Sequence, residues 1–257
     1  MKHKRRKKKS FLRRLLWTLL GILLFMGIGV AIFIFEPKWL QVGGLDRWIP
    51  SSTAQLTSGE NQTSTKEQLP DVSTSDWNLI LVNREHLTES IPPKLTTVED
   101  IQLDSRIEQA TKDFLAAIRK FEPEEAILSG YRSKAEQAEL FNEAVSETQT
   151  ANEISHKEAE SEVRKHIQLP GASEHQTGLA IDISVPSGQS DEVAEKIAVI
   201  APQYGFILRY PKDKSDVTGV DFENWHYRYV GVESATYMQK HGLALEEYIT
   251  QLKNARK

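Results

Sequence analysis

The sequence predicts an α+β fold in which a mainly antiparallel sheet is flanked by helices, preceded by one N-terminal transmembrane helix. Short apolar or aromatic stretches of strand length are spread over the chain after residue 77, and apolar residues recur between them with helical spacing. The predicted strands and helices do not alternate regularly, as a parallel sheet of βαβ units would require. An uncharged run near the N-terminus, Leu15 to Phe35, predicts the transmembrane helix.

This N-terminal segment divides into three predicted parts. Residues 1–14 hold nine Lys and Arg and no acid, which is typical of a cytoplasmic tail. A helix over 15–36 is about 31 Å long along its uncharged run, enough to cross a bilayer. A cleaved signal peptide is the alternative, but the run is longer than such peptides have and lacks a small-residue cleavage site. We therefore expect a single-pass cell-membrane protein whose remaining chain is extracellular.

The next predicted part is a linker over 37–76, because residues 51–75 are rich in Ser, Thr, Gln and Asn and bury little apolar surface. The folded domain is predicted over 77–257. After residue 14 the chain has 32 − 9 = 23 basic and 36 acidic side chains, a net charge of −13. Nucleic-acid binding is excluded on this balance, since phosphate contacts need positive charge. Absence of cysteine also excludes a Cys nucleophile and a Cys-ligated zinc site.

Within the domain, each element is predicted from its own pattern of apolar residues. A first strand is expected over 78–83, and a helix over 103–121 from apolar residues at helical spacing. The remaining expectations, in chain order, are a strand over 124–130, helices over 134–145 and 151–166, a strand over 179–185, a helix over 191–203, strands over 206–210 and 225–230, and a closing helix over 244–252.

A carboxylate in the middle of an apolar strand needs an explanation. Asp182 lies in Leu179–Ile183, where an unpaired charge costs several kcal/mol. His175 precedes it across a glycine-containing turn, and His226 lies in another strand with Glu223 three residues before it. Two imidazoles and a carboxylate form a common open set of ligands for catalytic Zn²⁺, and a further glutamate serves as the base. A metal would neutralise Asp182.

Serine catalysis is the rival chemistry for these residues. Ser129 and Ser173 are the candidate nucleophiles, but the chain has no G-x-S-x-G turn around either. Arg132 follows a predicted strand, where it either forms a surface ion pair or binds a substrate carboxylate or oxyanion. We expect Tyr210 to line the cleft.

Five stretches together resemble the VanY-like D-alanyl-D-alanine carboxypeptidases of the LAS metallopeptidase family. They are SGYRSKAEQAELF, PGASEHQTGLAIDIS, YGFILRYPKDK, TGVDFENWHYRYVG and LALEEYI, and the resemblance covers about Leu79 to Thr250. It implies a small α+β zinc peptidase of the LAS and hedgehog-like type that removes the C-terminal D-alanine from peptidoglycan stem peptides. One departure is Asn224, which stands where the family usually has proline.

The resemblance also assigns roles residue by residue. It implies that His175, Asp182 and His226 bind zinc and that Glu223 is the catalytic base. Arg132 would contact the substrate carbonyl or carboxylate, and Gln137 and Ser173 would border the substrate. An L,D-carboxypeptidase acting on tetrapeptide stems, a peptidoglycan endopeptidase and an inactive wall-binding module remain as alternatives. The sequence carries no signal for an oligomeric state.

Overall fold

The computed structural model describes residues 68–89 and 94–256, and all of these after residue 68 belong to one compact unit that begins at Leu69. None of the helices in these described ranges has both the length and the apolar content that a membrane crossing needs. The predicted tail, the transmembrane helix over 15–36 and most of the linker over 37–76 lie outside these ranges. The last residues of that linker are described, and Leu69 and Val72 pack against a buried apolar cluster.

A four-stranded antiparallel sheet carries the domain, in the order β3-β4-β6-β5. Its strands are β3 (Ala126–Ser129), β4 (Ala180–Ser184), β5 (Phe206–Tyr210) and β6 (Glu223–Tyr229). These strands confirm the ones expected over 124–130, 179–185, 206–210 and 225–230. They form there because β-branched and aromatic residues suit a half-buried pleated surface. The long β6 lies between β4 and β5, at the centre of the sheet.

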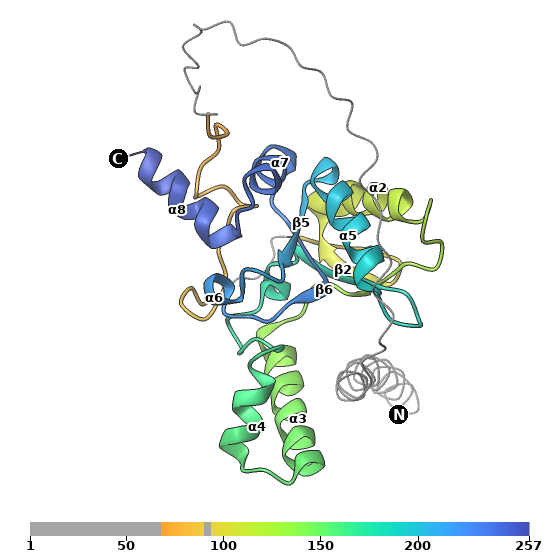
Figure 1. Ribbon diagram of the computed structural model, residues 1–257, viewed down its shortest axis with the longest axis vertical. Coiled ribbons are helices and arrows are strands. Elements are labelled where there is room, and N and C mark those ends of the chain that lie inside the picture. The colour runs from red at the N-terminus through yellow and green to blue at the C-terminus, as the bar shows by residue number, and fades with distance from the viewer. Residues whose placement is uncertain (1–67, 90–93, 257) are drawn as a thin grey trace, which may run out of the picture. The chain divides into compact units, whose positions relative to one another are not determined.

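Helices cover this sheet (Figure 1). The main apolar cluster joins its strands to α2 (Glu108–Ile118), α5 (Asp191–Ile200) and the short helix η4 (Ala201–Tyr204). A second cluster joins β5 to α7 (Val232–His241) and α8 (Leu245–Ala255). The helix expected over 191–203 is therefore α5 followed by η4, and the closing helix expected over 244–252 is α8. The short α6 (Ser215–Thr218) and α7 were not predicted.

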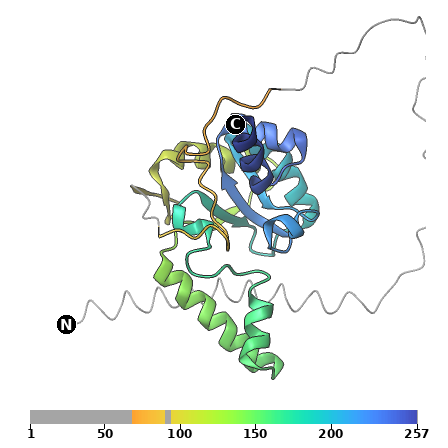
Figure 2. The same ribbon diagram turned by 90° about the vertical axis from the view of Figure 1, so that its left-hand side faces the viewer.

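The two helices α3 (Lys134–Asn152) and α4 (His156–Val163) lie side by side as a hairpin with its own small apolar cluster (Figure 2). Each begins with a serine whose side chain caps the helix and is paired reciprocally with a glutamate three residues later. Helix α3 runs seven residues beyond the expected 134–145. The helix expected over 151–166 is shorter, because Glu153 adopts a left-handed φ of 52° and interrupts the run before α4 begins.

Two predicted elements were wrong. No strand forms over 78–83. Leu79 and Val82 are buried, but no strand within the described residues pairs with this segment, and Arg228 donates to the carbonyls of Asn78 and Ile80. The helix expected over 103–121 begins only at Glu108. Its first residues instead belong to a hairpin of β1 (Leu95–Val98) and β2 (Ile101–Asp104), followed by the short helix η2 (Ser105–Ile107).

Candidate metal centre

His175, Asp182 and His226 come together at the centre of the sheet, and one donor atom from each lies within 4.8 Å of the others. Asp182 of β4 stands opposite His226 of β6 in the strand register, and His175 lies in the short helix η3 (Glu174–Thr177) that leads into β4. The Nε2 atom of His175 is 3.2 Å from Asp182 Oδ2, and the Nδ1 atom of His226 is 2.9 Å from Asp182 Oδ1. Tetrahedral zinc with bonds of about 2.0–2.1 Å separates its donors by roughly 3.3 Å, so the set fits this metal.

An irregularity in β6 brings Glu223 to the same place. Residues three apart in a regular strand face opposite sides of the sheet. Here the register with β5 shifts, since Leu208 pairs with Tyr227 but Tyr210 pairs with Glu223. Two additional residues of β6 are accommodated between these pairs, and Glu223 Oε2 lies 3.9 Å from His226 Nδ1. The bulge therefore places a buried carboxylate beside the donor set.

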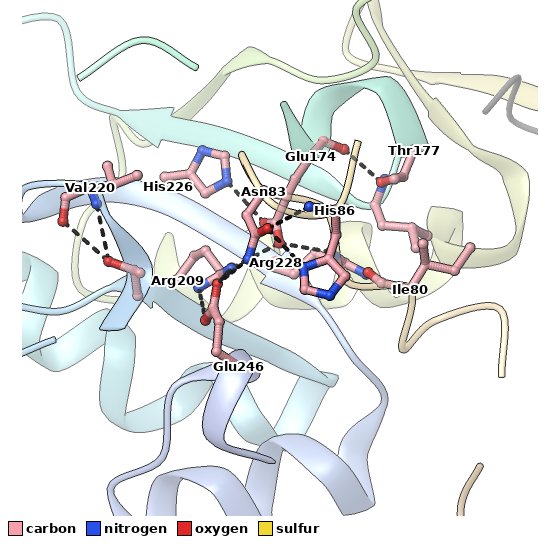
Figure 3. A network of polar contacts seen from close by, with 12 residues as sticks. Ile80, Asn83, His86, Glu174, Thr177, Arg209, Val220, His226, Arg228 and Glu246 are labelled. Carbon is pink, nitrogen blue, oxygen red and sulfur yellow. Dashed lines mark hydrogen bonds and ion pairs between the residues drawn. The ribbon is translucent and has the colours of Figure 1, made fainter. Parts of the chain in front are cut away.

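Polar contacts orient both imidazoles, and only that of His175 has a hydrogen bond on the ring nitrogen turned away from the donor set. His175 directs Nδ1 at the carbonyl of Gly130, 2.7 Å away, which leaves Nε2 for the donor set. His226 is turned the other way, with Nδ1 in the donor set and Nε2 pointing at Glu174 Oε2, 3.5 Å away (Figure 3). Metal-binding histidines commonly have such partners on the second ring nitrogen.

The charges of the site are strongly coupled. Burial alone would raise the pKa of Asp182, but His175 and His226 hold it well below its ordinary value. Burial raises the pKa of Glu223 to about 8, and the carboxylates of Asp182 and Glu174 add to this rise. Glu223 therefore favours the protonated form at neutral pH even though His226 and Arg209 lower its pKa, and a metal cation would favour its ionised form.

Arg132 and Gln137 form a rigid pair beside the donor set. The backbone N–H of Arg132 donates to the carbonyl of His175, 3.1 Å. Its guanidinium donates to Ser129 Oγ and to Gln137 Oε1, both at 2.9 Å. The amide of Gln137 donates in turn to the carbonyl of Gln168, 2.6 Å. Gln137 and Ser129 thus position the guanidinium.

The other two residues predicted to contact the substrate lie close by. Ser173 is buried and directly precedes η3. Tyr210 is buried, and the centre of its ring lies 5.0 Å from that of His226. The guanidinium carbon of Arg209 lies 4.9 Å from the centre of the Tyr210 ring. Asn224 donates to the carbonyl of Gln189 and to Asp191 Oδ1, so it ties the bulged end of β6 to the loop before α5.

Three functional candidates were missed by the sequence analysis: Glu174, Arg209 and Arg228. They form a fully buried ion cluster next to His226 (Figure 3). The signal was present, because Arg209 interrupts the apolar strand FILRY and Arg228 stands between two tyrosines of β6.

Comparison with known proteins places the chain in a family. The family model described as VanY, D-alanyl-D-alanine carboxypeptidase, matches residues 100–232. The chain is 38% identical over 197 residues to a D-alanyl-D-alanine carboxypeptidase of Enterococcus faecalis, an alignment that spans 74% of this chain and 71% of the relative.

Solved structures agree. The chain is similar to a mutant of the vancomycin resistance D,D-pentapeptidase VanY from a VanB-type resistance cassette in complex with Zn(II), with 36% identity and a TM-score of 0.61 over 68% of this chain and 99% of that one. It is also similar to the LD-carboxypeptidase LdcB, with 33% identity and a TM-score of 0.54 over 68% of this chain and 86% of that one. The chain therefore belongs to the VanY family of D-alanyl-D-alanine carboxypeptidases.

Proposed function

We propose that this chain is a zinc-dependent carboxypeptidase that removes the C-terminal D-alanine from peptidoglycan stem peptides. The observation that carries the proposal is the gathering of His175, Asp182 and His226 around one point, with the buried Glu223 beside them. The relative in complex with Zn(II) supports zinc as the metal.

Glu223 is the general base and acid of the proposed reaction. A bound Zn²⁺ would lower the pKa of a water molecule to about 7, polarise the scissile carbonyl and favour the ionised form of Glu223. The Glu223 carboxylate takes the proton of the attacking water and returns it to the departing amine nitrogen of D-alanine. His175, Asp182 and His226 hold the metal, so Glu223 is the carboxylate beside them that is left for proton transfer.

Arg132 binds the negative charge of the substrate. Burial lowers the pKa of its guanidinium, yet the nearby carboxylates of Asp182 and Glu223 favour the charged form. Its fixed position beside His175 suits the peptide carboxylate or the oxyanion that develops on the carbonyl. Ser173 and Tyr210 border the same space.

The likeness to LdcB supports a second candidate, an L,D-carboxypeptidase that acts on tetrapeptide stems. Both activities would use the same metal, base and arginine. They differ in the configuration of the residue before the scissile bond. Incubation of the purified full chain with defined pentapeptide and tetrapeptide stems, followed by mass analysis, separates them. Loss of one D-alanine from the pentapeptide alone supports the D,D activity, and loss from the tetrapeptide alone replaces it.

We also propose that the enzyme is anchored in the cell membrane with its catalytic domain outside. The basic tail followed by the uncharged run over 15–35 supports this topology. Peptidoglycan lies just outside the membrane. The polar stretch over 51–68, which precedes the compact unit, would give the domain a reach of about 20–25 Å if it behaves as a flexible coil.

Glu223→Gln tests the proposed mechanism. The amide keeps the shape of the side chain but cannot accept the proton, so zinc should remain bound while turnover falls by at least about 10²–10⁴-fold. The matched control is Asp221→Asn, which removes an exposed carboxylate two residues away and should keep turnover. Near-normal turnover of zinc-loaded Glu223→Gln, or loss of turnover in the control alone, would assign the base to Asp221 or another group.

A further inference from the structure

Glu174 precedes the proposed ligand His175 directly, but its side chain reaches the other histidine. The carboxylate is completely buried. Its Oε1 atom accepts hydrogen bonds from Arg209 Nε and Arg228 Nη1, both at 2.8 Å. Two arginines on one oxygen fix the carboxylate in the charged form and in one orientation.

The second oxygen of Glu174 is directed at His226. Oε2 lies 3.5 Å from His226 Nε2, at the outer limit of a hydrogen bond. Both atoms are buried, and neither has a hydrogen-bond partner among the residues that the structure describes. Buried polar atoms rarely remain unpaired, because each costs about 1–3 kcal/mol. The two orphan atoms therefore complement each other.

We propose that Glu174 is a positioning residue that accepts a hydrogen bond from His226 Nε2–H and thereby presents His226 Nδ1 to the metal. This inference rests on the proposed zinc site. It explains why the two histidines face the metal through different nitrogens: Gly130 holds His175 at Nδ1, whereas Glu174 holds His226 at Nε2. Such a partner also raises the basicity of the imidazole and so strengthens it as a ligand.

The buried charges around Glu174 are balanced by a residue of the last helix. Arg209 is shared between Glu174 and Glu246 of α8, to which it donates at 3.0 and 2.6 Å. Arg228 donates to the carbonyl of Ile80 at 2.8 Å (Figure 3). The cluster thus contains two arginines and two glutamates, and it connects the orientation of His226 to α8 and to the N-terminal segment of the domain.

The test compares the zinc affinity of the purified full chain and two variants by competition with a chelator. Glu174→Gln removes the charge that faces His226, and we expect the dissociation constant for zinc to rise about 10–100-fold. Glu246→Gln is the matched control, because it makes the same chemical change in the same ion cluster without touching His226. Its zinc affinity should stay that of the unchanged chain.

Equal zinc affinity of Glu174→Gln and the unchanged chain would overturn the inference, as would equal weakening in both variants. If Glu174→Gln fails to fold, the double variant Glu174→Gln/Arg228→Gln is used instead. It removes one charge of each sign and leaves the Arg209–Glu246 pair intact. Its zinc affinity is then compared with that of Arg228→Gln as the control. Failure of the unchanged chain to bind zinc would instead contradict the proposed function itself.

A second measurement needs no change at Glu174. In the zinc-loaded chain labelled with ¹⁵N-histidine, NMR should show His226 with zinc on Nδ1 and a slowly exchanging proton on Nε2. The ring signals are assigned through their correlation with the backbone resonances of His226 in the zinc-loaded chain, because His226→Ala is expected to lose the metal. Zinc on Nε2 of His226, or no proton there, would contradict the assigned role of Glu174.

Discussion

Glu125 is a buried carboxylate that the proposed reaction does not use, and it predicts how stability depends on pH. It lies just before β3 and is 1% exposed. Both of its carboxylate oxygens are without a hydrogen-bond partner among the described residues. Burial, with Glu122 nearby, raises the pKa of Glu125 from 4.5 to about 7. The folded protein therefore holds this proton over a pH range in which the unfolded chain releases it.

Proton linkage gives the direction in which the free energy of unfolding changes with pH. Because the folded state binds more protons between pH 4.5 and about 7, the contribution of Glu125 to stability is fully present below 4.5 and is lost as the pH rises through 7. The difference between the pKa values of 4.5 and about 7 corresponds to at most roughly 3.4 kcal/mol in the free energy of unfolding. About 2.5 kcal/mol of this stabilisation is lost between about pH 5 and about pH 8.5. Local rearrangement that admits water to Glu125 would make this loss smaller, so we expect the free energy of unfolding to fall by about 1–2.5 kcal/mol over this pH range.

Glu125→Gln removes the titration while keeping the shape of the protonated acid. We expect the variant to gain about 1–2.5 kcal/mol over the unchanged chain on going from about pH 5 to about pH 8.5. Urea denaturation of the metal-free chains at both values measures this double difference, in which all other titrations cancel. Glu124→Gln, which changes the exposed neighbour, is the control. The same stability difference between variant and unchanged chain at both pH values would refute the reasoning.

Four further predictions test other parts of the structure. His226→Ala should lose its zinc by elemental analysis, whereas His156→Ala, on the exposed face of α4, should keep it. Arg132→Gln should lower kcat/KM by about 10²-fold or more with zinc still bound, and an unchanged value would remove Arg132 from the reaction. Gly178→Ala should lower the free energy of unfolding by more than about 1 kcal/mol, because φ is +69° and its Cβ would lie 2.9 Å from the backbone nitrogen of Asp104; Gly242→Ala, with φ of +59° and open space around it, should cost less. Protease added to intact cells should digest the catalytic domain, and digestion only after lysis would reverse the proposed topology.

The sequence was most informative where local pattern and chemistry agreed. The strands around Asp182 and His226 were placed correctly because β-branched and aromatic residues are concentrated there. The start of α3 agrees with the expected residue 134, whereas the second helix was expected from 151 and begins at His156, because its serine cap at Ser155 was not recognised. The same reasoning failed at 78–83, because a short apolar run shows that a segment is buried but not which element covers it. In the structure those residues pack on a helix cluster and their carbonyls bond an arginine.

The bulge in β6 marks another limit of sequence reasoning. Spacing in a regular strand would have placed Glu223 and His226 on opposite faces, which counts against a shared site. Their association was proposed from chemistry and from the family resemblance, and only the register of β6 against β5 shows how three-residue spacing permits it. Such irregularities depend on the partner strand, so one strand read alone does not contain them.

A single physical question connects what was found with what was missed. Asking why Asp182 interrupts an apolar strand led to the metal site. Arg209 in FILRY and Arg228 in HYRYV pose the same question with the opposite sign, since a buried guanidinium also needs a partner. Both arginines have the same partner, Glu174, and that carboxylate has one oxygen left for His226. Glu174, which the sequence analysis did not single out, thus links the buried arginines to the candidate metal site.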